Sequence, residues 1–368
     1  MRSFCIATLL IVSASSTAPV HIELVITQKV ALRGELEDLV TFGLLKEMNC
    51  DSAGNIFSPS NRKYGDALNA IVRFPPDATS FTKFSIDALP HLEDGTIVDF
   101  DLEPNGDLYV FARQVLKYSE VNVPIQFGEN FVVHYDTKSQ VLFQLQLKLN
   151  TENFAPTGLA LLKSGEFLVV GYKQENGKTF IIGQITRPDG SLKTRFELNP
   201  GGTKTSNEKA ASGARVFHPI AIKANGFVYV MRGTTTEPVY LLSETGQLIK
   251  TIELRPLGLE FDSPKIIGDD LIVQAHTIPS DEDNSGIENN SGMKVRTTPY
   301  RRSFPIFSLK TGNIVAEYYW HQESLGLACY SPGLLTFIGQ ELSLPLEWAI
   351  FQAKPAGSAT AKTSLRGF

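Results

Sequence analysis

The chain has 368 residues, of which 42% are hydrophobic and 20% are charged, a composition typical of globular proteins. This length suffices for one large domain or two domains of ordinary size. The formal net charge of −5 argues against a nucleic-acid-binding surface. Together, 29 glycines and 20 prolines indicate a chain with many turns.

The first residues of the sequence resemble a secretory signal peptide. Arg2 is a short basic region, Phe4–Val12 is a short apolar run, and small residues follow from Ser13 to Ala18. The apolar run is too short to span a bilayer, and no other segment is a candidate transmembrane helix. We therefore expect residues 1–18 to be cleaved and the protein to be secreted or periplasmic. The alternative is a buried N-terminal strand or helix.

Residues 19–39 precede the regular part of the sequence. They contain Val20–Ile26, a strand candidate that can add to the last repeat as its outer strand and so join the two ends of the domain. In that case the C-terminal residues 360–368 form a weak strand or a tail. No sustained helical periodicity follows the signal-like segment.

A polar corner with a glycine recurs along the rest of the chain, as in EPNGDLYVFARQ at 103–114. In five of six copies the positions four and six before the glycine are apolar, which is the period of a strand with one buried face. The copy at Gly268 has a shortened turn and fits less well. The six turn glycines are Gly54, Gly106, Gly165, Gly226, Gly268 and Gly333.

A second pattern, strand–polar turn–strand, follows each corner. Each unit thus predicts four antiparallel strands, and six units recur at roughly the forty- to sixty-residue spacing of propeller blades. Because such a sheet cannot bury both faces alone, we predict an all-β, six-bladed β-propeller over residues 40–368. The alternatives are a pair of β-sandwiches or a β-helix. The second pattern covers residues 70–86, 131–147, 180–198, 238–254, 305–320 and 348–365.

Two insertions interrupt the regular spacing. Pro200–Ala214 and Pro279–Arg296 are polar and rich in glycine, serine or asparagine. This composition is typical of mobile loops, which is what we expect for both segments.

Three cysteines are present, and Cys5 belongs to the signal-like segment. Cys50 and Cys329 both lie four residues before a corner glycine, in the first and last copies, which are neighbours in a closed ring. Two thiols of an exported protein can pair. We expect instead two buried thiols, because equivalent positions on neighbouring strands should exceed the roughly 7 Å Cα separation that a disulfide allows.

Two of the corners, IVDFDLEPNGDLYVFA at 97–112 and PTGLALLKSGEFLVVGY at 156–172, resemble the NHL repeat. The stretch YLLSETGQLIKTI at 240–252 is similar to the later hairpin of that family. The resemblance extends over most of the chain after residue 40 and implies a six-bladed propeller of the NHL-repeat and TolB-like superfamily. Its members include binding scaffolds, lactonases, other hydrolases and a lyase-type branch, so it implies architecture more than activity. The sequence departs from the pattern where an Asp usually ends the second strand; these positions hold Arg113, Tyr172, His276 and Gln340.

A propeller brings the starts of its inner strands and the ends of its second strands to one mouth of the central channel, where ligands usually bind. Strand register predicts that this mouth is lined by Glu47, Asp99 and Asp262 at strand starts and by Arg113, Tyr172 and Arg232 at strand ends.

The three predicted carboxylates can bind Ca²⁺ through oxygen ligands, as the resembled lactonase-type propellers bind a metal at such a place. His218 or His276 can then act as a general base. The alternative is that these acids form ion pairs with Arg113 and Arg232. The sequence contains no Gly-x-Ser-x-Gly nucleophile motif, no phosphate-binding glycine loop and no Cys/His cluster with metal-ligand spacing.

Because no catalytic set is recognisable, the sequence predicts a secreted binding or scaffold protein that presents the channel mouth to a protein, peptide or glycan. We expect a monomer without a nucleic-acid partner or a membrane span. The alternative is a metal-dependent hydrolase of the lactonase kind at the same mouth.

Overall fold

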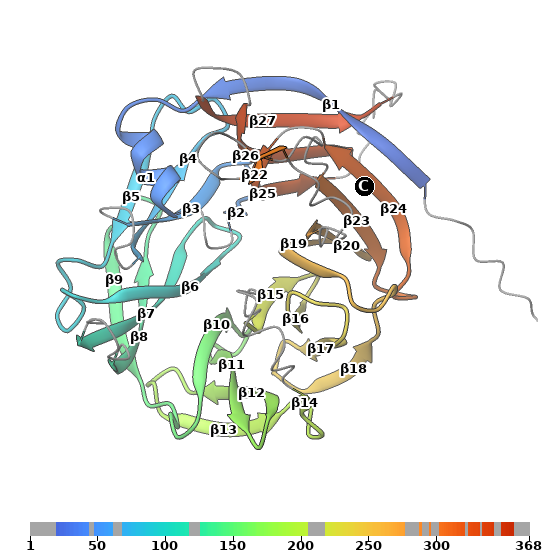
Figure 1. The fold of residues 1–368 in the computed structure, drawn as a ribbon. Coiled ribbons are helices and arrows are strands. Elements are labelled where there is room, and N and C mark those ends of the chain that lie inside the picture. Colours follow the sequence, from blue (N-terminus) through green and yellow to red (C-terminus); the bar gives the residue numbers. More distant parts are fainter. Residues whose placement is uncertain are drawn as a thin grey trace, which may run out of the picture.

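The fold is all-β, with sheets arranged around a common axis in the manner of a β-propeller (Figure 1). The computed structural model describes residues 20–43, 48–61, 68–117, 126–204, 218–276, 287–288, 294–295, 302–320, 323–331, 333–341 and 347–356. No helix among these residues is long and apolar enough to cross a membrane.

Four antiparallel sheets follow one another in chain order. The first sheet contains β2 (Asn49–Cys50), β3 (Ile56–Asn61), β4 (Leu68–Phe74) and β5 (Thr82–Ser85). The second contains β6 (Thr96–Leu102), β7 (Leu108–Lys117), β8 (Gln126–Tyr135) and β9 (Val141–Leu147). The third contains β10 (Ala155–Leu161), β11 (Phe167–Glu175), β12 (Lys178–Thr186) and β13 (Leu192–Glu197), with β14 (Thr203–Lys204) beside β12. The fourth contains β15 (Ile220–Ala224), β16 (Phe227–Met231), β17 (Val239–Ser243) and β18 (Leu248–Ile252).

The remaining long strands form one eight-stranded sheet in the order β19-β20-β23-β24-β1-β27-β26-β25. Its strands are β19 (Glu260–Ile267), β20 (Asp270–His276), β23 (Arg302–Ser308), β24 (Ile314–Trp320), β1 (Val20–Ala31), β27 (Glu347–Pro355), β26 (Leu334–Glu341) and β25 (Glu323–Ser331). A separate pair consists of β21 (Ile287–Glu288) and β22 (Lys294–Val295). The rest of the predicted loop Pro279–Arg296, like residues 205–214 of the other, lies outside the described residues.

Strand β1 joins the two ends of the chain. Its residues Leu24–Ala31 pair in antiparallel fashion with β27, whereas Val20–Glu23 pair in parallel with Ala316–Tyr319 of β24. The segment that contains the strand candidate Val20–Ile26 therefore lies between the last strand of the chain and a strand of the preceding repeat.

The recurring corner has a conformational explanation. All six corner glycines adopt positive φ values, from 58° at Gly268 to 89° at Gly106. Side chains disfavour this left-handed region and glycine does not, so the turn from the innermost strand to the next one calls for glycine in each copy. The copy at Gly268 has the lowest value of the six, in line with its shortened turn.

The core lies between neighbouring sheets. Phe57 and Phe84 of the first sheet pack with Val110 of the second, and Phe111 of the second packs with Phe167 of the third. All five side chains are buried. Burying each contributes on the order of 1.5–3 kcal/mol, so each sheet is stabilised by its neighbours.

A short helix, α1 (Glu35–Gly43), was not predicted from the sequence. Its Leu36, Leu39 and Val40 are buried in one cluster with residues of the first sheet and of the strands β25–β27. Nine residues give too few turns for a clear helical period, and this is why the pattern went unrecognised.

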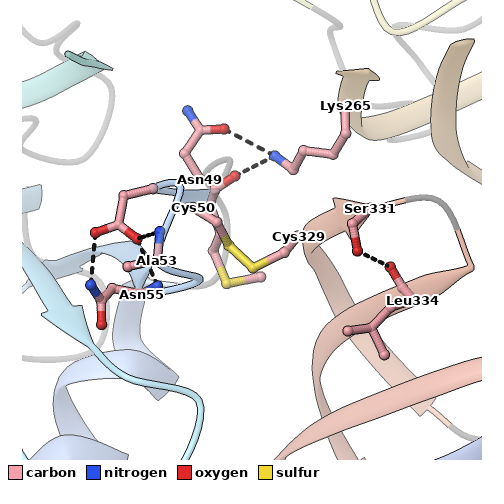
Figure 2. Close-up of a disulfide and its surroundings, with 10 residues drawn as sticks. Asn49, Cys50, Ala53, Asn55, Lys265, Cys329, Ser331 and Leu334 are labelled. Atoms are coloured by element: carbon pink, nitrogen blue, oxygen red, sulfur yellow. Dashed lines mark hydrogen bonds between the residues drawn. A yellow bond between two sulfur atoms is a disulfide. The ribbon is translucent and has the colours of Figure 1, made fainter. Parts of the chain in front are cut away.

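The prediction of two buried thiols is wrong, because Cys50 of β2 and Cys329 of β25 form a disulfide with a Cα separation of 5.6 Å (Figure 2). The inner strands of the first and last repeats are closer than we expected, and the bridge joins positions 279 residues apart. Nearby, Lys265 of β19 contacts the start of β2. It donates to the carbonyl of Met48, just before that strand, and at 3.2 Å to Oδ1 of Asn49.

Candidate functional site

The described sheets place the residues that we predicted at the ends of the second strands at equivalent positions in their repeats. In four repeats, a residue near the end of the second strand pairs with the first residue of the innermost strand. These pairs are Arg113 with Thr96, Tyr172 with Ala155, His276 with Glu260 and Gln340 with Glu323. For His276 and Gln340 only the backbone is described.

Three of the predicted residues lie close together on consecutive sheets. The ring of Tyr172 on β11 stacks on the ring of His218, which lies just before β15, with centroids 5.2 Å apart and planes 15° from parallel. Tyr172 partly opposes the lowering of the Arg113 pKa, which places this tyrosine near Arg113 on β7. We call Arg113, Tyr172 and His218 the rim cluster. It combines a cation with two aromatic faces, of which His218 is exposed and Tyr172 half-buried.

Arg113 has an unusual environment for an arginine. Its Nε donates to Oδ1 of Asn130 at 3.2 Å, and its guanidinium lies 4.4 Å from the ring centre of Phe127. Within the described part of the chain no carboxylate forms an ion pair with it. Burial lowers the pKa of Arg113 from 12.5 to about 10, because the charged form loses hydration that Asn130 and Phe127 replace only in part.

Arg232, another predicted mouth residue, lies in a different environment from that of Arg113. It forms an ion pair with Glu237, whose side chain is only 2% exposed. A buried carboxylate without a cation is destabilising, so Arg232 stabilises its own sheet by neutralising Glu237.

Asp99 also has a structural contact. Its Oδ2 accepts a hydrogen bond from the backbone N–H of Leu159 at 2.8 Å, and Oδ2 of Asp101 accepts one from Leu161 at 2.9 Å. Both donors belong to β10, the edge strand of the third sheet. Two carboxylates of the second sheet thus satisfy backbone groups of the next one, where no further strand is available to do so.

A cation completes this contact between sheets. Nζ of Lys223 on β15 lies 3.3 Å from Oδ2 of Asp101 and also forms an ion pair with Glu103. Burial raises the pKa of Asp101, although Lys223 and the Leu161 N–H oppose the change. Burial disfavours the charge on Lys223, but Asp101 and Glu103 outweigh it and raise the pKa of the lysine. Asp101 of the second sheet therefore contacts both the third sheet, through Leu161, and the fourth sheet, through Lys223.

The other predicted metal ligands are not brought into one described group. Asp262 is half-buried on β19, opposite Gln274 in register, and Glu47 lies outside the described residues. The part of the chain that the structure describes contains no group of three or more His, Cys, Asp or Glu side chains with metal-binding geometry. A Ca²⁺ site at Glu47, Asp99 and Asp262 therefore stays a prediction.

Sequence reasoning missed the role of Asp101, Glu103 and Lys223. The signal was present as acidic residues at every second position in DFDLE, 99–103, since such residues share one face of a strand. The partner of that face was not visible, because Lys223 is 120 residues away from Glu103 along the chain.

Comparisons with known proteins show the fold alone. No protein-family model and no curated protein matches the chain. A protein of unknown function from Dyadobacter fermentans DSM 18053 is similar in structure, with a TM-score of 0.51 at 9% identity over 90% of this chain and 99% of that one. A Trypanosoma rangeli sialidase in complex with sialic acid gives 0.44 at 10% identity over 90% of this chain and 57% of that one. A chain of a mitotic checkpoint complex gives 0.42 at 12% identity over 95% and 99%. The last two scores are too low to support an argument.

Proposed function

We propose that the eight-stranded sheet consists of two blades, so that the protein is a six-bladed propeller of the NHL-repeat and TolB-like kind. In support, β19-β20-β23-β24 and β25-β26-β27-β1 are each a run of four strands, and each begins with a corner glycine between its first two strands. The runs are joined where Val20–Glu23 pair with β24. On this interpretation β1 serves as the outer strand of the last blade and continues onto the neighbouring one.

We further propose that the protein is an exported binding or scaffold protein whose channel mouth binds a protein, peptide or glycan that carries an anionic group. The observation that carries this proposal is Arg113, a half-buried cation whose described contacts are neutral. A protein-internal arginine is normally matched by a carboxylate, as Arg232 is by Glu237. A ligand anion would supply a negative charge that the described residues do not place beside Arg113, and the rings of Tyr172 and His218 offer flat apolar surface to the rest of the ligand.

The described residues favour binding over the alternative, a metal-dependent hydrolase. Asp99, the central ligand of the predicted metal site, directs Oδ2 to the backbone of the next sheet. Metal analysis of the purified protein tests the alternative, since stoichiometric Ca²⁺ or Zn²⁺ that is lost on Asp99→Ala would favour the hydrolase.

Export has support of its own. A disulfide that joins distant parts of a chain persists in oxidising compartments and is rare in the reducing cytosol. Together with the signal-like residues 1–18, the bridge supports a secreted or periplasmic location.

The binding function can be tested by screening the protein against immobilised glycans and peptides, each presented in neutral and carboxylate-bearing forms. We expect binding to carboxylate-bearing ligands, weakened by about tenfold to a hundredfold in Arg113→Gln, since a hydrogen bond to a charged group contributes about 1.5–3 kcal/mol. Arg187→Gln is the matched control, because Arg187 follows Thr186 at the opposite end of the third sheet, where β12 pairs with Phe167. Equal affinity of the two variants, or a preference for neutral ligands, would contradict the proposal.

A further inference from the structure

The outer strand of the fourth sheet has an exposed edge. β18 is the last strand of its sheet, and within the described residues no other strand pairs with its outer side. Leu248 and Ile249 are 48% and 51% exposed, and Lys250 and Thr251 are exposed as well. An edge strand with apolar side chains offers both unpaired backbone groups and apolar surface, which together favour the addition of a further strand.

A groove lies beside this strand. It has a volume of about 360 Å³ and separates the end of β18 from the turn between β23 and β24. Its walls are held in place by the backbone, since the N–H of Arg255 donates to the carbonyl of Gly312 at 2.8 Å. We call it the β18 groove; its lining includes Lys250, Thr251, Glu253, Arg255, Lys310 and Asn313.

The groove is basic although the whole chain carries a net charge of −5. Arg255 is near Glu253, at 3.7 Å, and Lys310 pairs with Asp269 at 2.6 Å. No described residue forms an ion pair with Lys250. Three cations against two acids leave a positive surface, which favours an acidic occupant.

The chain itself shows that an outer edge of this fold accepts an added strand. Val20–Glu23 of β1 pair in parallel with Ala316–Tyr319 of β24, the outer strand of the next repeat. That edge is therefore covered by a segment distant in sequence, whereas the corresponding edge of β18 is not covered by any described strand.

We propose that the β18 groove binds an extended segment of a partner protein in which acidic and apolar residues alternate, added as a strand to the outer edge of β18. Alternation follows from strand geometry, because successive side chains point to opposite faces. One set then lies on the face of the edge that presents Lys250, Arg255 and Lys310, and the other lies on the opposite face. Leu248 and Ile249, which are consecutive in β18, offer one apolar side chain to each face. This surface is separate from the rim cluster, so the two proposals can fail independently.

The test uses three fluorescein-labelled eight-residue peptides, titrated against the full chain by fluorescence anisotropy. In the first peptide Glu and Val alternate, in the second Lys and Val alternate, and the third is the first with every second backbone nitrogen methylated. We expect the Glu/Val peptide to bind at least about tenfold more tightly than either of the others, because one peptide carries the opposite charge and the other lacks every second backbone donor.

Charge reversal locates the site. Lys250→Glu combined with Lys310→Glu should weaken binding of the Glu/Val peptide by about tenfold or more, whereas Lys138→Glu, an exposed lysine of the β8–β9 turn, should leave it unchanged. The proposal is overturned if the Glu/Val peptide does not bind, if the methylated peptide binds as well as the parent, or if Lys138→Glu weakens binding equally. It is also overturned if sedimentation shows a dimer that Lys250→Glu dissociates, since a second copy would then occupy the edge.

Discussion

Removing the disulfide between Cys50 and Cys329 should lower the free energy of unfolding by several kcal/mol. The bridge closes a loop of 279 residues in the unfolded chain. Chain-entropy arithmetic for a loop of that length gives a loss of about 19 cal/mol/K on cross-linking, or about 5–6 kcal/mol at 25 °C. Measured values for natural bridges more often lie at about 2–5 kcal/mol, because unfolded chains retain structure. We therefore expect a decrease of about 2–5 kcal/mol in the double variant Cys50→Ala/Cys329→Ala.

The assay is equilibrium unfolding in urea, followed by tryptophan fluorescence, with and without dithiothreitol. The unfolding midpoint of the natural protein should fall on addition of reductant to that of the double variant, while the midpoint of the variant itself should not move. Because the effect acts mainly through the unfolded chain, the folded spectrum should stay the same.

Alkylation in denaturant supplies the decisive control. Mass spectrometry of peptides that contain Cys50 and Cys329 should show neither one alkylated unless reductant is added first. Alkylation of both without reductant would refute the bridge and restore the interpretation as two thiols. If the unfolding midpoint of the natural protein does not change on addition of reductant, the bridge, although formed, does not contribute to the free energy of unfolding.

Three further predictions concern single residues. Arg113→Met should raise the free energy of unfolding at pH 7 by about 1–3 kcal/mol, because the difference between a pKa of 12.5 and one of about 10 corresponds to about 3 kcal/mol, which Asn130 and Phe127 offset in part. The gain should shrink as pH rises above about 10, where the folded protein releases the proton more readily than the unfolded chain does. Lys223→Met should destabilise by about 3–5 kcal/mol at neutral pH, because Asp101 is left buried without its cation. Since the folded-state pKa of Lys223 is raised, its contribution is fully present below pH 10.5 and is lost as pH rises through the folded value. Gly312→Ala should cost about 2–4 kcal/mol, because φ is +74° and a Cβ would overlap the carbonyl oxygen of Glu253.

Urea unfolding across a pH series checks all three. Gly333→Ala is the matched control for the glycine, since its φ is +78° but nothing lies within 4 Å of an added Cβ, so it should cost only about 1 kcal/mol. Equal losses at Gly312 and Gly333 would mean that backbone conformation alone matters. A destabilised Arg113→Met would show that its contacts with Asn130 and Phe127 outweigh its desolvation, and a pH-independent loss in Lys223→Met would exclude an ionic origin.

Local rules explain why the repeating unit could be predicted from the sequence. A corner glycine with positive φ and an apolar residue six positions before it are each set by contacts within one hairpin or one face. Met48, Phe100, Leu159 and Leu327 are accordingly buried at that position. Such features are encoded within a few residues and can be recognised by counting.

Contacts between sheets were harder to predict, because they depend on distances that no local pattern contains. Cys50 and Cys329 were correctly placed on equivalent strands, yet their separation of 5.6 Å depends on how closely two inner strands approach the axis. Asp99 was predicted to lie at the channel mouth, and strand register alone did not predict that its carboxylate accepts a hydrogen bond from the backbone of β10 in the next sheet. Strand register gives the face of a residue but not what the adjoining sheet places opposite it.

Several of these contacts occur at the edges of strands. A ring of separate sheets leaves an inner and an outer edge on each one, and unpaired backbone groups at an edge need partners. At the inner edge of β10 the partners are the carboxylates of Asp99 and Asp101. At the outer edge of β24 the partner is β1, which also closes the chain by pairing with β27. Acidic side chains at one edge and the N-terminal strand at another thus both form hydrogen bonds with the backbone groups of an edge strand. Where the described chain provides neither, as at the outer edge of β18, water can satisfy the backbone groups, and the partner strand that we propose would replace that water.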